Sequence, residues 1–432
     1  MLPALALFLA LPVAPFGGCA WAEDEAETRQ EAWERRRREK AAALRPPRQG
    51  LVERNILLLE KAERPGLLAW NVGGFYPRVQ AIGWGSQTAA GARFWQPDVK
   101  GSKLDVHAAA FYSIRRYESY ELQAGLLPHR GRALPARSTT GDDVYELGGI
   151  RRRGGRQGHV YASLRYRHLP EVDFWGLGTD SRPEDRTTFL LQDAWYDLVA
   201  GYQHGSRAVV TARAGRMQVF VGPGRDDAFP TTQERFTEAV VPGLARQPDF
   251  THVSLLGLLD GRDEPHNPHS GAMLAVSAAR FDDRGGDAYR FDRFAADARV
   301  FVPLGSTQRV LGLRALLTAD RPAEGSRVPF FLQETLGGSR TLRGFRSFRF
   351  RGEKLVLLQA EYRWEAAPAV ELAAFVDAGR VASHVADWSL RDLRTSYGLG
   401  LRIKTHDRVL ARLELGHSDE ETRVLLRLGP SF

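Results

Sequence analysis

The chain has 432 residues, of which 43% are hydrophobic, and it carries a formal net charge of +8 from 60 Lys+Arg and 52 Asp+Glu. The arginines are spread along the whole length among acidic residues and form no basic stripe, which argues against a nucleic-acid-binding protein. The single cysteine, Cys19, excludes a disulfide framework and a thiolate metal site in the rest of the chain.

The N-terminus has the features of an export signal. Residues 2–19 are almost wholly apolar, and Ala20-Trp21-Ala22 forms a small-x-small pattern before acidic Glu23. An apolar run this short and proline-rich favours a secretory signal peptide over a spanning helix. We predict a signal peptide over residues 1–22; a lipoprotein signal at Cys19 and a retained anchor are the alternatives.

Residues 23–77 form a distinct segment between this signal and the body of the chain. Its first part, residues 23–45, is alanine-rich and densely charged. That composition is typical of a solvated helix or a disordered tail. We predict a periplasmic N-terminal segment, helical or disordered, over residues 23–77.

From residue 78 onward, the recurring unit is a segment of about ten residues with alternating polarity, bounded by turns rich in Gly, Pro and Asp. Such segments include residues 103–112, 144–152, 158–166, 251–259 and 309–318. No later segment approaches the roughly 18 apolar residues that a spanning helix needs. We therefore predict an all-β fold: a transmembrane antiparallel β-barrel of sixteen strands, closed on itself, over residues 78–432.

Residues 355–364 show the alternation most clearly. The even positions are apolar or aromatic and include Tyr362 and Trp364, whereas the odd positions include Gln359, Glu361 and Arg363. We expect the even side chains to face lipid, with the two aromatic residues at the membrane interface, and the odd side chains to face the lumen.

Two further segments near the C-terminus alternate in the same way. Residues 369–379 place Val370, Leu372, Ala374 and Val376 on one face and Glu371 and Asp377 on the other. A slip of one residue would bring these carboxylates into hydrocarbon, so the register is strongly specified. The final strand ends on Phe432. A terminal phenylalanine after an alternating strand resembles the outer-membrane β-signal, so Phe432 is the expected C-terminal insertion signal.

Two short motifs carry a family resemblance. The tetrad Leu342, Arg343, Gly344 and Phe345 has an aliphatic-Arg-Gly-aromatic pattern, and residues 375–379 have a Phe-x-Asp-x-Gly pattern formed by Phe375, Asp377 and Gly379. Both resemble motifs of the BamA/TamA superfamily of outer-membrane barrels, known as the bacterial surface antigen type. In that family the tetrad lies in the sixth extracellular loop, which folds back into the lumen.

The resemblance implies a lock between this loop and the barrel wall. The family's loop arginine pairs with the inward aspartate, which implies an Arg343–Asp377 contact here. On the preceding segment, Glu361 is the second expected lumen partner. Such a charge-assisted contact would tether the loop inside the barrel. Whether it gates the barrel or only stabilises the loop is left open.

Other segments extend the resemblance over residues 78–432. Residues 260–271 resemble the family's Asp-x-Arg-Asp turn with its Asn-Pro pair, and residues 175–181 resemble another turn of these barrels. The best-known members carry periplasmic POTRA domains. Residues 23–77 are too few for one such domain beside a linker, so the expected form has a barrel alone.

Catalytic and metal sites are not predicted. His266 and His269 lie in a turn rich in Pro and Asn with no third ligand nearby. The chain has no Gly-x-Ser-x-Gly nucleophile setting, and Gly222-Pro223-Gly224 lacks the context of a phosphate-binding loop. We expect no enzyme, no metal and no cofactor.

The resemblance implies a protein of the bacterial outer membrane. It would take part in protein or lipid insertion or translocation through a loop-gated barrel; a passive porin or a barrel enzyme is the alternative. The expected partners are outer-membrane lipid, the barrel-assembly machinery that inserts the chain itself, and an unidentified polypeptide or lipid cargo. Nucleic acid is not an expected partner.

Overall fold

The structure is a computed structural model. It describes residues 33, 35–37, 39, 73–80, 89–128, 158–205, 207–226, 228–264, 267–382, 390–404 and 409–428. The chain divides into two units, residues 1–52 and 53–432. The described residues of the first unit are helical and exposed. Among the described residues, no helix is long and apolar enough to cross a membrane.

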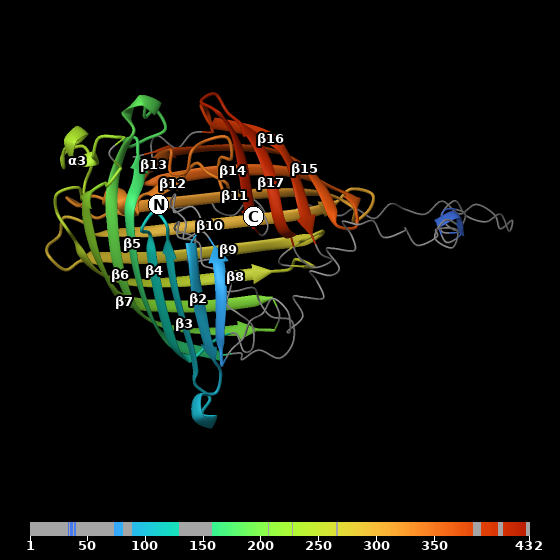
Figure 1. Ribbon diagram of the computed structural model, residues 1–432, viewed down its shortest axis with the longest axis horizontal. Helices are drawn as coiled ribbons and strands as arrows, with labels where there is room; N and C mark the ends of the chain where they lie inside the picture. Colours follow the sequence, from blue (N-terminus) through green and yellow to red (C-terminus); the bar gives the residue numbers. More distant parts are fainter. Residues whose placement is uncertain are drawn as a thin grey trace, which may run out of the picture. The chain divides into compact units, whose positions relative to one another are not determined.

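The second unit is built around one antiparallel sheet of sixteen strands, each paired with its neighbour along the chain (Figure 1). The strands are β1 (Phe75–Gln80), β2 (Ala89–Gln96), β3 (Asp105–Ser113), β4 (Glu118–Leu126), β5 (Gly158–Phe174), β6 (Thr187–His204), β7 (Ala208–Pro223), β8 (Asp249–Asp260), β9 (Gly271–Asp283), β10 (Phe291–Pro303), β11 (Arg309–Pro322), β14 (Lys354–Ala367), β15 (Val370–Ala382), β16 (Arg394–Lys404), β17 (Val409–His417) and β18 (Thr422–Leu428). The predicted all-β, antiparallel fold is confirmed.

The predicted alternation is also confirmed strand by strand. On β14, Tyr362 and Trp364 are 38% and 42% exposed, whereas Glu361 and Arg363 are 1% and 3% exposed. On β15, Val376 is 53% exposed and its neighbour Asp377 is fully buried. Apolar side chains therefore cover the outer face of the sheet, and charged side chains point into the interior that the sheet encloses, here called the lumen.

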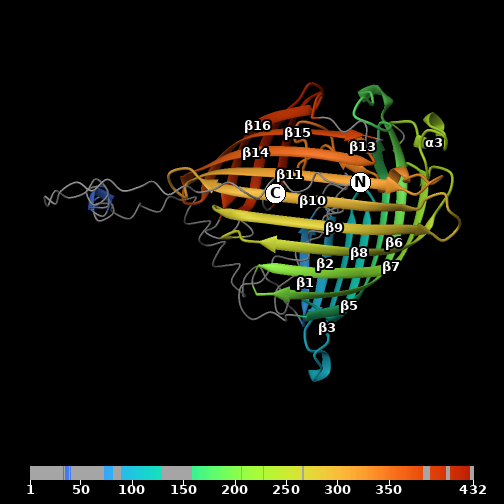
Figure 2. The same cartoon turned by 180° about the vertical axis from the view of Figure 1, so that it is seen from behind.

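Closure of the barrel stays a prediction. Among the described residues, no ladder joins β1 to β18. The sheet nevertheless curves strongly, since β2–β5 and β8–β11 run across one another in both Figure 1 and Figure 2. Three predictions fall outside the described residues: the signal peptide over 1–22, the strand over 144–152 and the insertion signal at Phe432.

The two ends of the sheet differ in the length of their connections. At one end, residues 175–186, 224–248 and 323–353 join β5–β6, β7–β8 and β11–β14. At the other end, residues 205–207, 304–308 and 368–369 join β6–β7, β10–β11 and β14–β15, whereas one longer connection, residues 127–157, joins β4 to β5. Outer-membrane barrels have long extracellular loops and short periplasmic turns, so we assign the first end, called the outer end, to the cell exterior.

An apolar core fills the lumen near the outer end. It contains aromatic side chains from the strands, such as Phe174 and Phe189, and side chains from the loops, such as Val241 and Phe330. The ring centroid of Phe330 lies 5.2 Å from that of Phe174 and 4.8 Å from that of Phe189. Residues 323–353 therefore reach across the outer end and pack on β5 and β6.

Residues 224–248, which include the short helix α3 (Thr232–Arg235), are held to the β9–β10 connection by one carboxylate. Glu238 accepts hydrogen bonds from the amides of Gly243 and Ala245, both at 2.7 Å, and from the Tyr289 hydroxyl at 2.6 Å. Burial alone would raise the pKa of Glu238. The hydrogen bonds from Ala245, Tyr289 and Gly243 outweigh it and hold the pKa below its ordinary value of 4.5.

This contact predicts an acid-sensitive loop. A carboxylate with a depressed folded-state pKa contributes stability above its unfolded pKa and loses it as the pH falls through the folded value. We expect a spin label on Val240→Cys to become more mobile as the pH falls through the lowered pKa of Glu238, which lies below its ordinary value of 4.5. In the Glu238→Gln background the label should be mobile at neutral pH already and show no such step. An unchanged wild-type spectrum down to pH 2–3 would contradict the assignment.

Candidate functional site

Residues 323–353, here called the long loop, contain the predicted tetrad and fold into the lumen. The loop carries the turn η4 (Phe330–Leu332) and a small sheet formed by β12 (Glu334–Leu336) and β13 (Phe350–Gly352). Gly337 and Gly338 have φ angles of 113° and 91°. At Gly337 an added Cβ would lie 2.0 Å from the Arg346 carbonyl oxygen. Glycine is therefore required where the chain turns back toward the tetrad.

The two apolar members of the tetrad anchor the loop tip. Leu342 and Phe345 are fully buried. The ring centroid of Phe345 lies 5.2 Å from that of Phe350 on β13, in an edge-to-face arrangement. Both residues belong to one buried cluster, whose other members are Leu316, Leu336, Phe350, Leu355, Leu357 and Val381. Hydrophobic burial thus brings the loop tip to the inner face of β11, β14 and β15.

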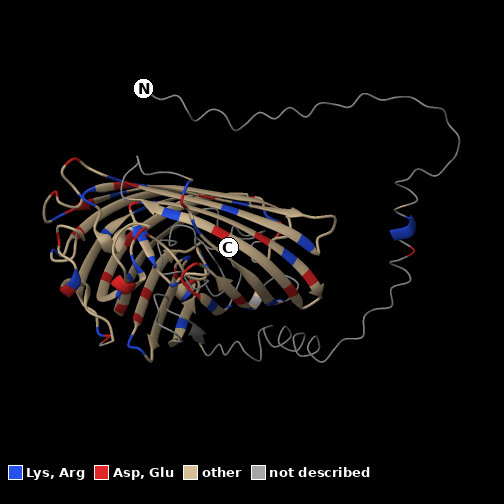
Figure 3. Ribbon diagram, turned by 90° about the horizontal axis from the view of Figure 1, so that it is seen from above, with Lys and Arg blue, Asp and Glu red and all other residues tan. Residues whose placement is uncertain are grey.

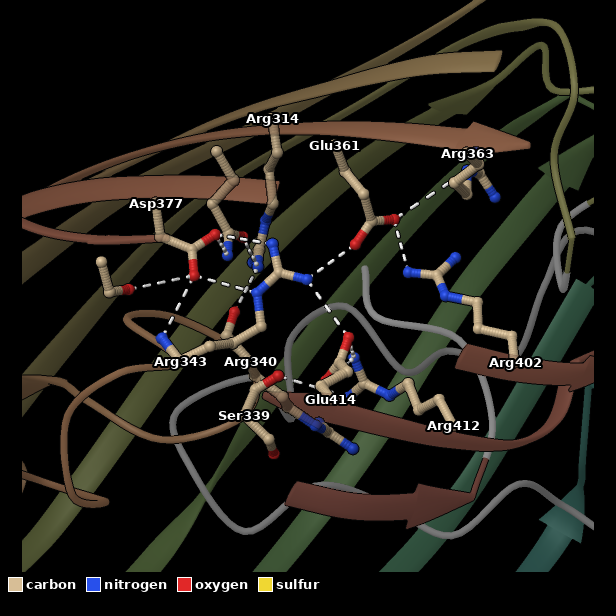
Figure 4. Close-up of polar contacts among 12 residues, drawn as sticks. Arg314, Ser339, Arg340, Arg343, Glu361, Arg363, Asp377, Arg402, Arg412 and Glu414 are labelled. Carbon is tan, nitrogen blue, oxygen red and sulfur yellow. Dashed lines mark hydrogen bonds and ion pairs between the residues drawn. The ribbon is translucent and has the colours of Figure 1, made fainter. Parts of the chain in front are cut away.

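Arg343 makes the central contact with Asp377 (Figure 4). Its Nε donates to Asp377 Oδ2 at 2.9 Å and its Nη2 to Oδ1 at 2.7 Å, while its backbone amide donates to Oδ2 at 3.1 Å. Both side chains are fully buried. One inward carboxylate therefore holds the main chain and the side chain of the loop tip together, in the bidentate geometry that suits arginine.

Further side chains complete the surroundings of the guanidinium. Arg343 Nη1 donates to Glu361 Oε2 at 2.6 Å and to Glu414 Oε1 at 3.2 Å. The guanidinium carbon lies over the ring of Phe375, 3.5 Å from the ring centroid. Glu361, Phe375 and Asp377 are the residues singled out from the sequence, and the structure brings all three to Arg343. Glu414 on β17 was missed.

The two glycines of the motifs have separate structural reasons. At Gly344 an added Cβ would lie 2.6 Å from the His417 carbonyl oxygen and 2.8 Å from Ser396 Cβ. The loop backbone is thus pressed directly against β16 and β17. At Gly379 on β15 an added Cβ would lie 2.9 Å from the Val356 oxygen and 3.0 Å from Leu336 Cδ1, where the small sheet of the loop packs on the wall.

The wall carboxylates are neutralised by a second layer of arginines. Arg402 binds Glu361 at 2.6 Å and Glu371 at 3.1 Å. Arg412 binds Glu414 at 3.1 Å and also donates to the Ser339 carbonyl oxygen of the long loop at 3.3 Å. Both arginines lie at inward positions of β16 and β17, and the alternation along these two strands would have predicted that placement.

A further arginine links this network to the opposite end of the lumen. Arg363 lies 3.9 Å from Glu361 and donates to the Pro268 carbonyl oxygen at 2.8 Å. Pro268 belongs to the Asp-Arg turn between β8 and β9, which is braced by the Arg262–Asp260 pair at 2.7 Å. The long loop and the Asp-Arg turn, which approach from opposite ends of the sheet, therefore share one set of charged residues.

The second turn picked out from the sequence also contacts the long loop. The amide of Gly178 donates to the Arg351 carbonyl oxygen at 2.7 Å, and Thr179 Oγ1 donates to the Val381 carbonyl oxygen at 2.7 Å. Arg349 reaches back to Ser181, with 2.8 Å between its Nη1 and the hydroxyl oxygen. Residues 175–181 thus connect β5–β6 to the long loop and to β15.

The arrangement holds the long loop against the wall through charges that are paired with one another. Within the described residues, no group of three or more His, Cys, Asp or Glu side chains could hold a metal ion. Of the histidines considered from the sequence, His269 lies 3.9 Å from Asp263, and His266 is outside the described residues. The chemistry available to the site is ion pairing and burial.

Comparison with known proteins adds the following findings. Residues 242–417 match the Omp85 superfamily domain; this range includes β8–β17 and the long loop. No curated protein matches the sequence. The structure is similar to that of BamA from Haemophilus ducreyi lacking POTRA domains 1-3, with a TM-score of 0.55 and 13% identity over 82% of this chain and 68% of that chain.

Two further solved structures are similar at 13% identity. CdiB from Escherichia coli has a TM-score of 0.49, with 84% of this chain and 64% of that chain covered. CdiB from Acinetobacter baumannii has a TM-score of 0.46, with 79% and 57% covered. The present chain therefore spans less than two thirds of either CdiB chain.

Proposed function

We propose a specific role for this chain, which is a BamA/TamA-type β-barrel of the bacterial outer membrane with an Omp85 superfamily domain. It acts in the insertion or translocation of protein or lipid. The long loop gates its lumen. The release of Arg343 from the wall is the step that opens the barrel. The action is conformational and involves no covalent chemistry.

The observation that supports the proposal is the burial of Arg343 among three carboxylates. Asp377, Glu361 and Glu414 all lie within 3.2 Å of its guanidinium. Buried ion pairs seldom add much net stability over apolar packing, because desolvating the charges costs several kcal/mol. A contact of this kind is well suited to a switch, since an incoming cargo that offers competing carboxylates or backbone groups can exchange with it.

Planar-bilayer recording tests the gate. We expect the wild-type barrel to conduct weakly and Arg343→Ala to open long, large-conductance events, because the loop tip loses its cationic contact with Asp377. Arg346→Ala is the matched control. It lies in the same loop, and its side chain is 47% exposed with a single ion pair to Glu421 at 3.2 Å. This control should behave as the wild type does.

A wild-type barrel that is already fully conducting, and is unchanged by Arg343→Ala, would favour a passive porin and refute gating. The expected partners follow from the same proposal. They are membrane lipid around the apolar outer face, the barrel-assembly machinery for insertion of the chain itself, and a polypeptide or lipid cargo that passes the opened lumen.

A further inference from the structure

A row of charged side chains crosses the outer face of three adjacent strands near the outer end. Arg280 on β9 is in register with Asp292 on β10, and Asp292 is in register with Arg321 on β11. The next outward position on β10, Phe294, is 50% exposed. The row therefore belongs to the lipid-facing side of the sheet, whereas the network around Arg343 belongs to the lumen.

The position of the row relative to the membrane follows from β11. All outward side chains of this strand between Arg309 and Arg321 are apolar: Leu311, Leu313, Ala315, Leu317 and Ala319. Twelve residues at about 3.4 Å, on a strand tilted by about 45°, span about 29 Å of membrane. That is close to the thickness of the apolar band of such barrels, about 25 Å. Arg321 and its row thus lie at the level of the headgroups.

The carboxylates of this region are already engaged. Arg280 Nη1 lies 3.9 Å from Asp292, and its Nε lies 3.1 Å from Asp282. Arg290 binds the same Asp282 at 3.0 Å and Asp287 at 2.6 Å. Arg321 is exposed, and no carboxylate of the described residues lies within 4 Å of its guanidinium. Within the row, two arginines stand against one aspartate, and Arg321 is available to an outside partner; with Arg290, Asp282 and Asp287 included, the charges of the region balance.

The opposite wall has a different composition at its outward positions. Strands β3–β6 present tyrosines there, Tyr112, Tyr120, Tyr166 and Tyr196, which are 37–50% exposed. Tyrosine is the usual residue of an interfacial belt. Across the sheet as a whole, acidic and basic residues are interspersed (Figure 3). An outward arginine also lies on β7, but there Arg216 is paired with Asp249; the row across three strands in register belongs to β9–β11.

We propose that Arg280 and Arg321, the two arginines of this row, bind the phosphate group of an anionic lipid in the outer leaflet, while Asp292 between them only positions Arg280. Arg321 makes the main contact through its guanidinium, which matches a phosphate bidentately. Arg280, held in place by Asp282 and Asp292, makes the second. The two arginines stand two strands apart, about 10 Å between backbones, so both side chains reach a headgroup seated over β10.

Native mass spectrometry of the full chain in neutral detergent tests this site. The probes are lipid A with both phosphates, the same lipid after removal of its phosphates, and inorganic phosphate. We expect the wild type to retain phosphorylated lipid A in preference to the dephosphorylated lipid. The Arg280→Gln/Arg321→Gln variant should bind about tenfold more weakly, which corresponds to about 1.4 kcal/mol. Inorganic phosphate at millimolar concentration should not displace the lipid.

Arg309→Gln is the matched control, because Arg309 is an outward arginine at the other end of β11 and its neighbour in register is Trp364, with no second arginine. It should keep most of the binding. Equal binding by the double variant, equal binding of the dephosphorylated lipid, an equal loss in Arg309→Gln, or displacement by inorganic phosphate would each overturn the proposal. Heat-dependent gel migration establishes that each variant is folded; Arg321→Gln alone serves if the double variant is not.

Discussion

Replacing Arg343 by methionine is expected to lower the free energy of unfolding by about 3–5 kcal/mol, because it leaves buried charge without its partner. Glu361 and Glu414 keep Arg402 at 2.6 Å and Arg412 at 3.1 Å. Asp377 has no such substitute: its other partners in the described residues are Gln359 at 3.0 Å and Ser396 at 3.4 Å. Most of the loss therefore arises at Asp377.

A double-mutant cycle separates this contact from the rest. Asp377→Asn in the Arg343→Met background should recover part of the loss, so that the double variant is more stable than the sum of the single effects predicts. Urea unfolding of the reconstituted barrel measures each value. Arg346→Met, an exposed ion pair in the same loop, should cost under about 1 kcal/mol. Strict additivity of Arg343→Met and Asp377→Asn would show that the contact contributes no coupling.

Gly344→Ala is expected to displace the loop tip without changing any charge. The new methyl group would lie 2.6 Å from the His417 carbonyl oxygen and 2.7 Å from its carbonyl carbon. These are backbone atoms of β17 and cannot yield as a flexible side chain could. Overpacking of this kind costs about 1–3 kcal/mol. This cost destabilises the loop bound to the wall relative to the loop released from it.

Cysteine labelling reports the displacement. With the one native cysteine, Cys19, replaced by serine, Ser339→Cys, at a position 8% exposed, provides a single buried reporter beside the tetrad. Adding Gly344→Ala should raise its rate of maleimide labelling about 5–150-fold, the shift in open population that 1–3 kcal/mol produces. Gly158→Ala, where an added Cβ meets nothing within 4 Å, should leave the rate unchanged. Equal rates in both variants would contradict the close seating of Gly344.

The alternation of side chains was enough to predict the sheet and the inward placement of Asp377 and Glu361, because period two is a local property of each strand. The tetrad identified Arg343 through resemblance. Neither could identify Glu414, which lies 71 residues from Arg343. Its contact depends on how deep the loop descends, and this depth depends on packing against strands that are distant in sequence.

The lumen near the outer end is apolar, which the alternation within single strands does not predict. Phe174 and Phe189 point inward, where the apolar residues of the loops cover them. The same explanation holds for strands with apolar residues on both faces. On β8, Leu256 and Leu258 point inward and pack with Val209, Met273 and Ala275 on the adjacent strands. Loop and strand packing replaces water at these positions, and a pattern confined to one strand cannot foresee this.

The contacts of the long loop fall into two groups that differ in sequence separation. Arg343 meets Glu361, Asp377 and Glu414 across 18, 34 and 71 residues, whereas the Thr179–Val381 bond spans 202. Short chain closures cost less entropy and form sooner than long ones. The C-terminal strands can therefore bind the loop tip as soon as they pair, and the contacts across the outer end of the lumen form last, when the strands from the first half of the chain arrive.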